Sequence, residues 1–236
     1  AEKAEQTGKF YGLMMDHVRK VLSDVKRVYP GYNEEKGYEL AGFVWFQGWN
    51  DMVASGTYPN RGQPGGYDAY TDCLAHFIRD VRKDLEAPKM KFVIGVMGVG
   101  GPLEQYASQR YVPIHGAFRE AMAAPSLMPE FKGNVFAVRT AKFWDMRLKE
   151  LEDNQERVKQ MAGFLKNSHK DHANRDGSMT VSEQKEYLEK YRRKLISAED
   201  EAYAKIARSN GGDHYFGSAK TMARIGKAFA EATLQT

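Results

Sequence analysis

Residues 39–51 read ELAGFVWFQGWND, an apolar run that ends at a glycine and is followed by polar side chains. β-Branched and aromatic residues dominate the run, which is typical of a strand covered on both faces of a sheet. KFVIGVMG, from residue 91, and NVFAVRT, from residue 134, have the same character. We therefore expect three buried strands, near residues 40–46, 91–97 and 134–140.

Segments with helical periodicity surround these strands. Apolar residues recur at the spacing of one helix face over residues 10–28 and 67–85, and IHGAFREAMAA begins another helix at Ile114. The last segment, residues 217–234, has small residues on its apolar face and predicts a helix that packs on the sheet. Because strands that alternate with helices indicate a parallel sheet, we expect an α/β fold with three layers, α/β/α.

The stretch from residue 147 to residue 208 is long and highly charged, and we expect it to be a helical insertion. It would separate the first part of the α/β domain, residues 1–146, from a final loop and helix at residues 209–236. Nucleic-acid and membrane partners are not expected. The 35 basic and 31 acidic residues are mixed along the chain, and no apolar run approaches the roughly 18 residues that a membrane span needs.

The insertion contains HANRDGSMTVSE, residues 172–183, which resembles a degenerate EF-hand calcium loop. Several residues suit that motif, namely Asn174, Asp176, Gly177, Met179 and Glu183. The first ligand position is His172, however, and imidazole is a poor ligand for calcium. We therefore favour a glycine-stabilised turn between two helices over a metal site, and we expect no metal and no cofactor.

The polar residues after the first strand are the first candidate site. In open parallel sheets, ligands bind beyond the carboxyl ends of the strands, which is where GWND lies. The backbone N–H of Gly48 and the side-chain amide of Asn50 are suitable donors for a developing oxyanion. The alternative is structural, with Asn50 and Asp51 capping the strand end in a turn.

His214 is the second candidate, since it follows two glycines and stands directly before the last helix. A histidine at that edge of the sheet can act as a general base, or it can cap the helix. His17, His76 and His115 occur on helical segments among charged neighbours, where surface or helix-end positions are expected rather than catalytic ones. The single cysteine, Cys73, excludes an internal disulfide and is expected to be a small buried hydrophobe.

Together, Gly-x-Asn-Asp after an internal strand and a histidine before the last helix resemble the SGNH-hydrolase family. VWFQGWND resembles the strand end of carbohydrate esterases related to sialate O-acetylesterase and acetylxylan esterase, and the resemblance covers residues 9–146 and 209–235. It implies a flavodoxin-like fold and a serine nucleophile. It also assigns the site residues: His214 as base, Gly48 and Asn50 as oxyanion donors, and Gln47, Trp49 and Asp51 as substrate-binding residues.

The sequence departs from the family pattern in three places. Gly211 stands where the family often has an aspartate, and Trp49 stands where related esterases commonly have a glutamate. No Gly-Asp-Ser or Gly-Gln-Ser-Asn stretch occurs, and Ser55, Ser108 and Ser218 lack the strand-to-helix turn of a nucleophile. We expect the serine on an upstream segment or partner chain that completes the sheet, so that this chain alone is inactive.

The resulting hypothesis is a carbohydrate O-acetylesterase that removes acetyl groups from sugars. The expected partner is an acetylated carbohydrate, and the expected location is periplasmic or secreted, although AEKAEQTGKF has no signal-peptide pattern. The alternative is a non-catalytic carbohydrate-binding or scaffold protein that has kept the fold. A serine within about 3 Å of His214 would distinguish the enzyme from the binding protein.

Overall fold

The computed structural model describes residues 8–106 and 108–235. Its three strands, β1 (Gly42–Trp45), β2 (Lys91–Val96) and β3 (Val135–Arg139), form one parallel sheet in the order β1-β2-β3. Trp45 lies opposite Ile94, which lies opposite Ala137. The predicted α/β fold class is confirmed, and each strand lies within its expected range.

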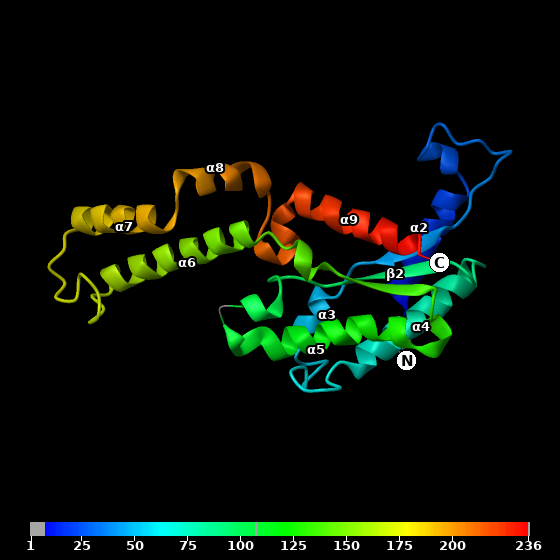
Figure 1. The fold of residues 1–236 in the computed structure, drawn as a ribbon, viewed down its shortest axis with the longest axis horizontal. Helices are drawn as coiled ribbons and strands as arrows, with labels where there is room; N and C mark the ends of the chain where they lie inside the picture. Colours follow the sequence, from blue (N-terminus) through cyan, green and yellow to red (C-terminus); the bar gives the residue numbers. More distant parts are fainter. Residues whose placement is uncertain (1–7, 107, 236) are drawn as a thin grey trace.

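Helices cover both faces of the sheet (Figure 1), which gives the predicted three layers. α4 (Asp68–Asp84) and α5 (Val112–Ala123) lie on one face, and α9 (Ala219–Thr233) lies on the other. β2 is the central strand, and its Phe92, Val93 and Ile94 are fully buried. Its Gly95 admits close packing, because a Cβ there would overlap the rings of Phe46 and Phe229.

The remaining elements are short or belong to the opening and inserted segments. They are α2 (Lys9–Leu22), α3 (Trp49–Val53), α6 (Met146–Lys166), α7 (Val181–Leu195) and α8 (Ala198–Ala207). The short 3₁₀ helices of the described residues are η1 (Val25–Arg27), η2 (Leu103–Gln105), η3 (Gln109–Tyr111), η4 (Ala124–Leu127), η5 (Pro129–Phe131), η6 (Thr140–Phe143) and η7 (Gly212–Gly217). No helix in the described part of the chain has the length and apolar character needed to cross a membrane.

The opening helix α2 is shorter than expected and packs beside α4. It ends at Leu22, whereas the periodicity predicted a helix to residue 28. The Tyr11 hydroxyl donates to Asp84 Oδ2 at 2.8 Å, and the Tyr11 ring packs edge-on against Phe77. Met15 is the one residue of α2 that is buried, while Phe10 is 83% exposed. Much of the apolar face therefore has no cover within the described residues.

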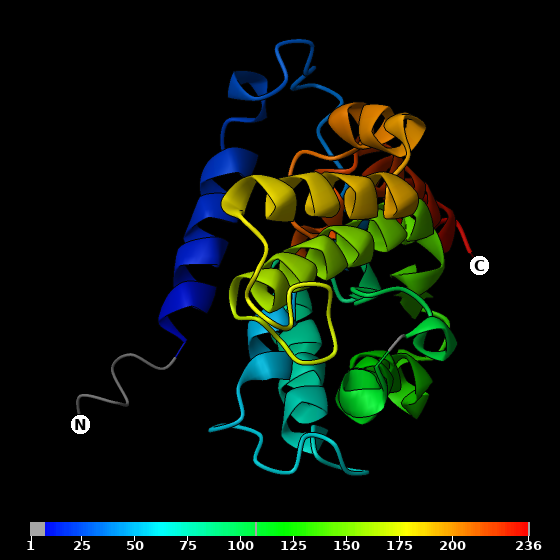
Figure 2. The same ribbon diagram turned by 90° about the vertical axis from the view of Figure 1, so that its left-hand side faces the viewer.

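The charged segment folds as a helical hairpin that projects from the α/β part (Figures 1 and 2). α6 packs against α7, and α8 returns the chain to the sheet. Asn174 closes the loop between α6 and α7: its Nδ2 donates to Leu165 O at 2.8 Å, and its Oδ1 accepts from the Met179 N–H at 2.8 Å. Glu183 caps α7 by accepting from the Thr180 N–H. These two side chains of the EF-hand-like loop are thus engaged with protein atoms.

Cys73 is exposed, so the prediction that it is buried was wrong. Its thiol lies on the exposed side of α4, whereas a buried position was predicted. The neighbouring Leu74 and Ala75 are the buried residues of this turn of the helix. The prediction was wrong because a small residue fits either side of an amphipathic helix, and periodicity alone does not fix its burial.

We predict opposite effects for two Gly→Ala substitutions. Gly98→Ala should destabilise the fold by about 3 kcal/mol, because the new methyl would overlap the backbone of Ala141 and neither segment can move aside freely. Gly163→Ala, in the middle of α6, should stabilise by about 1 kcal/mol, since nothing lies within 4 Å of the added methyl. Urea unfolding measures both, and equal effects would contradict the packing described.

We also predict that Asn174→Ala destabilises the chain by about 1–3 kcal/mol, because it leaves the buried carbonyl of Leu165 and the partly buried N–H of Met179 without their partner. Asp176→Asn, at an exposed position of the same loop, should have little effect. Millimolar calcium should leave the melting temperature of the unsubstituted chain unchanged. A rise of many degrees with calcium, abolished by Asp176→Asn, would instead identify a metal site.

Candidate active site

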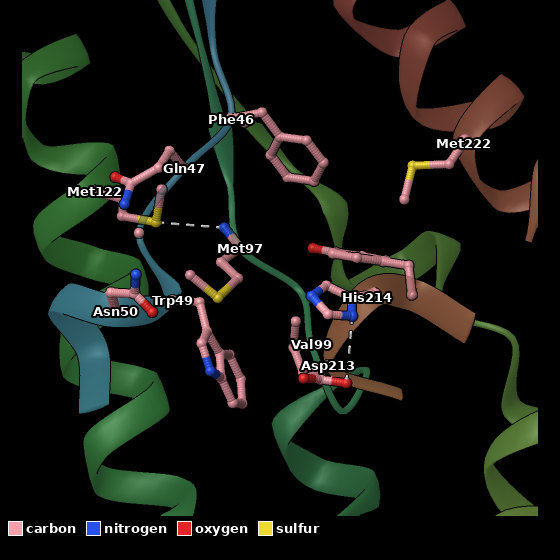
Figure 3. Close-up of a pocket in the computed structure, with 13 residues that line it drawn as sticks. Phe46, Gln47, Trp49, Asn50, Met97, Val99, Met122, Asp213, His214 and Met222 are labelled. Atoms are coloured by element: carbon pink, nitrogen blue, oxygen red, sulfur yellow. Dashed lines mark hydrogen bonds and ion pairs between the residues drawn. The ribbon is translucent and has the colours of Figure 1, made fainter. Parts of the chain in front are cut away.

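A cavity of about 400 Å³ opens beyond the carboxyl ends of β1 and β2 (Figure 3). Residues after β1, residues of and after β2, the loop before α9, and one methionine each from α5 and α9 line it: Phe46, Gln47, Gly48, Trp49 and Asn50; Gly95, Met97 and Val99; Asp213, His214 and Tyr215; Met122; and Met222. The fold therefore brings the residues after β1 and the histidine before α9 to one place. Asp51 is not among the lining residues, and its carboxylate accepts a hydrogen bond from Gln47 Nε2 at 3.4 Å.

Two tyrosines of the α4 region hold the turn from β1 into α3. The Tyr70 hydroxyl donates to Gln47 O at 3.2 Å, and the Tyr67 hydroxyl donates to Met52 O at 2.6 Å. Burial raises the pKa of Tyr67 to about 12, so its hydroxyl stays a proton donor at neutral pH. The backbone of GWND is thus fixed at both of its ends.

Gly48 has a packing reason to be glycine. A Cβ at this position would lie 2.8 Å from the ring of Phe118. Gly48 is also the N-cap of α3, and its carbonyl accepts from the Met52 N–H at 2.9 Å. No side chain caps this helix, so Asn50 and Asp51 lie within α3 and do not have the capping role considered for them. Asn50 is exposed at the cavity wall.

The loop that carries His214 adopts an unusual backbone. Tyr215 and Phe216 both lie in the left-handed region, with φ values of 52° and 59°. Each such residue costs roughly 1–2 kcal/mol relative to ordinary backbone, so the surrounding contacts must offset the strain. Both side chains are buried, and both rings pack against Trp144. Aromatic packing therefore holds the loop in a conformation that it would not adopt alone.

The Tyr215 hydroxyl anchors this loop to the sheet. It accepts from the Gly98 N–H at 2.6 Å and lies 2.7 Å from Thr140 Oγ1. Thr140 uses its own proton to donate to Val96 O at 2.8 Å, so Tyr215 is the donor to Thr140. Burial raises the pKa of Tyr215, which keeps the proton on its hydroxyl. Tyr215 and Thr140 were not predicted from the sequence as site residues; the available signals were that Tyr215 follows His214 and that Thr140 directly follows β3.

His214 itself is accessible, with 66% of its side chain exposed. Its Nδ1 lies 3.3 Å from Asn210 Oδ1 and 3.7 Å from Asp213 Oδ1. Among the described residues, no serine lines the cavity. Ser218 is buried and caps α9 by accepting from the Thr221 N–H, and Ser108 caps η3. The cavity therefore contains the proposed base without a nucleophile from this part of the chain.

His115 lies in the first turn of α5, one of the two kinds of position expected for it, and not on the surface. It is partly buried behind the cavity wall, with its Nδ1 2.8 Å from the Tyr106 hydroxyl and its ring edge-on to Trp49 at 6.5 Å. Burial, and then the charge of Arg119, lower its pKa to about 4, so the ring is neutral at pH 7. Tyr106 and Arg119 both donate to the carbonyl of Val99. Tyr106 and Arg119 thus hold the backbone of Val99, which lines the cavity.

The chain is an α/β protein with a parallel sheet. Its cavity brings together Gly48, Asn50 and His214, a set that makes it a candidate hydrolase site. The family model for the carbohydrate esterase, sialic acid-specific acetylesterase, matches residues 2–128. That match covers more than half of the chain, which therefore belongs to this esterase family. The resemblance inferred from VWFQGWND is confirmed, while His214 lies outside the matched residues. No curated protein and no solved structure matches the chain.

We predict that Tyr215→Phe destabilises the protein by about 1–3 kcal/mol, because the Gly98 N–H would remain buried without its acceptor. Tyr187→Phe, on the exposed side of α7, is the matched control and should change stability by less than about 0.5 kcal/mol. The two free energies of unfolding in urea provide the comparison. Similar values for both variants would show that the hydroxyl of Tyr215 does not anchor the loop.

Proposed function

We propose that this protein is a carbohydrate O-acetylesterase whose serine nucleophile comes from a segment outside this chain. The observation that carries the proposal is the cavity that brings Gly48, Asn50 and His214 together at the carboxyl end of the sheet. Membership of the sialic acid-specific acetylesterase family supports the substrate class, an O-acetylated sugar. The chain would then contribute the base, the oxyanion donors and part of the sugar pocket.

The reaction assigns a role to each of these groups. The serine Oγ attacks the carbonyl carbon of the acetyl ester, and its proton passes to His214. The bond from the acetyl carbon to the sugar oxygen then breaks, and that oxygen receives the proton from His214. Water, activated by the same histidine, hydrolyses the acetyl-serine to acetate and free serine. His214 is accessible for this exchange because its side chain is mostly exposed at the cavity.

Gly48 and Asn50 would bind the oxygen that becomes negative during the attack. The backbone N–H of Gly48 and Nδ2 of Asn50 are donors of the kind that stabilise such an oxygen. Because a side chain at position 48 would collide with Phe118, the local backbone is closely packed and not free to shift. Preorganisation of this kind lets the donors act without a cost of reorganisation during the reaction.

Gln47 and Trp49 are proposed to contact the sugar, since both line the cavity. Asp51 would act through Gln47, because its carboxylate accepts a hydrogen bond from Gln47 Nε2. The Trp49 ring is partly exposed and offers an apolar face to the C–H surface of a sugar ring. Sugar recognition would therefore come from the same turn that supplies the oxyanion donors.

An additional segment beside β1 is part of the proposal. Among the described strands, β1 pairs only with β2, and Val44 of β1 is 46% exposed. A strand placed along that edge would pair the remaining backbone groups of β1 and would end near the cavity. The intact mass and N-terminal sequence of the native protein test this directly. A native protein that starts at residue 1 and has no tightly bound partner would contradict the proposal.

We also propose a periplasmic or secreted location, where an esterase could act on acetylated carbohydrates outside the cytoplasm. Cell fractionation followed by immunodetection tests this statement. Enrichment in the periplasm or the medium is the expected result, and enrichment with the cytoplasmic markers would contradict it.

The rival function is binding of a carbohydrate without catalysis. The absence of a serine among the described residues that line the cavity favours it. The two functions differ in one measurable respect, since an esterase releases acetate from the sugar and a binding protein does not. Both would use the aromatic and amide groups of the turn after β1.

We predict that His214→Ala lowers kcat for an acetyl ester by several orders of magnitude in the protein with its upstream segment present. Asn50→Ala should cost less, about a hundredfold to a thousandfold in kcat, because it removes one oxyanion donor and leaves the nucleophile and base in place. His76→Ala, on the exposed side of α4, is the control and should leave kcat unchanged. Substrates are 4-nitrophenyl acetate, an O-acetylated sialoside and an acetylated xylo-oligosaccharide.

Near wild-type turnover in the His214 variant would eliminate the esterase mechanism. Acetylated sugar that binds to the wild-type protein without release of acetate would support the binding rival. Equal losses in the Asn50 and His76 variants would show that the amide has no special part in the reaction.

A further inference from the structure

The loop before α9 holds Asn210 beside His214. The carbonyl of Phe216, a fully buried residue, accepts from the N–H groups of Ser209 at 2.9 Å and Asn210 at 3.0 Å. The Phe216 N–H donates in turn to Gly211 O at 2.9 Å. These bonds close the chain on itself, so the backbones of Asn210 and His214 have a fixed relative position. The hydrogen bonds of the loop backbone therefore keep the side chains of Asn210 and His214 close to each other.

The side-chain amide of Asn210 has a determined orientation. Its Oδ1 lies 2.8 Å from the backbone N of Gly211, which can only donate a hydrogen bond. The atom that faces this N–H must therefore be the oxygen and not the NH₂ group. The ambiguity that usually affects asparagine amides is thus removed by a neighbouring backbone donor.

The same oxygen favours one tautomer of His214. It lies 3.3 Å from His214 Nδ1, and an amide oxygen can only accept. A hydrogen bond between these two atoms requires the proton on Nδ1, which leaves the lone pair of the neutral ring on Nε2. In Figure 3 the ring nitrogen that is not joined to Asp213 faces the cavity. The nitrogen with the lone pair is therefore the one that faces a substrate.

The charged groups around the loop are less suited than Asn210 to accept a hydrogen bond from His214 Nδ1. Asp213 Oδ1 lies 3.7 Å from His214 Nδ1, beyond hydrogen-bond distance, and its side chain is 49% exposed. Water screens an ion pair of this kind, so its contribution is small. Glu152 of α6 faces Gly212, where a Cβ would lie 3.0 Å from its Oε2. The amide of Asn210 is thus the nearest acceptor for the Nδ1 proton.

We propose that Asn210 is the positioning residue of His214: it accepts the Nδ1 proton and leaves Nε2 as the basic nitrogen at the cavity. The carboxylate nearest to His214 Nδ1 in this loop, that of Asp213, lies beyond hydrogen-bond distance, so the neutral amide of Asn210 has the orienting role. The catalytic use of Nε2 rests on the proposed function. The tautomer does not, because it follows from the hydrogen bonds of this loop.

The test is the tautomer of His214, read by long-range ¹H–¹⁵N correlation spectra of the ¹⁵N-histidine-labelled chain at a pH where the ring is neutral. His214→Gln assigns the resonance among the six histidines. We expect protonated Nδ1 in the unsubstituted chain and its loss in Asn210→Ala. Asp213→Asn should retain it, and so should Ser209→Ala, which removes the hydrogen bond from the Ser209 hydroxyl to Gly217 O in the same loop. Asn210→Asp should also retain it, because a carboxylate accepts equally well.

Protonated Nε2 in the unsubstituted chain would overturn the proposal, as would an unchanged tautomer in Asn210→Ala or its loss in Asp213→Asn. Unchanged resonances of the other histidines show that each variant is folded. With the upstream segment present, Asn210→Ala should lower kcat about tenfold or more with KM unchanged, and Asn210→Asp should restore it. The predicted tautomer in a protein without esterase activity would remove the proposed function and leave the positioning contact in place.

Discussion

The hydrogen bond from the Gly98 N–H to the Tyr215 hydroxyl is the constraint on which the site depends. It joins the end of β2 to the loop before α9, and Thr140 extends it to the segment after β3. Because the loop contains two left-handed residues in succession, it needs this anchor and the packing around Trp144 to keep its shape. One buried hydroxyl therefore fixes the loop that carries His214, the proposed base, and the ring of His214 stays accessible at the cavity.

Close backbone packing fixes the turns that follow β1 and β2 at the edge of the cavity. Gly48 lies against Phe118, and Gly98 lies against the backbone of Ala141, so both turns at the sheet edge are positions where a side chain does not fit. Tyrosines 67 and 70 fix the turn after β1 from the other side. Gly48 and Asn50, the groups proposed to bind an oxyanion, thus stand on rigid backbone, while the ring of His214 remains exposed. This division suits a site in which donors are preorganised and the base exchanges protons.

The sequence predicted the features that depend on pattern. Buried strands leave continuous apolar runs, and polar residues directly after β1 must lie at the carboxyl edge, so the cavity residues Gln47 to Asn50 were predictable. Features that depend on three-dimensional packing were not. Cys73 fits either side of α4, and His115 is drawn inward by Tyr106, a loop residue with no periodic signal. The anchoring role of Tyr215 depends on backbone angles that no local pattern specifies.

The most direct measurement of the central claim is the crystal structure of the native protein, with the upstream segment that we propose, after inactivation by a phosphonate ester. The account predicts a serine of that segment bonded to phosphorus inside the cavity of Figure 3. One phosphonyl oxygen should accept hydrogen bonds from the Gly48 N–H and from Asn50 Nδ2, and His214 Nε2 should lie within hydrogen-bond distance of the serine Oγ. A phosphonate bonded elsewhere, or one whose oxygen points away from Gly48 and Asn50, would contradict the account.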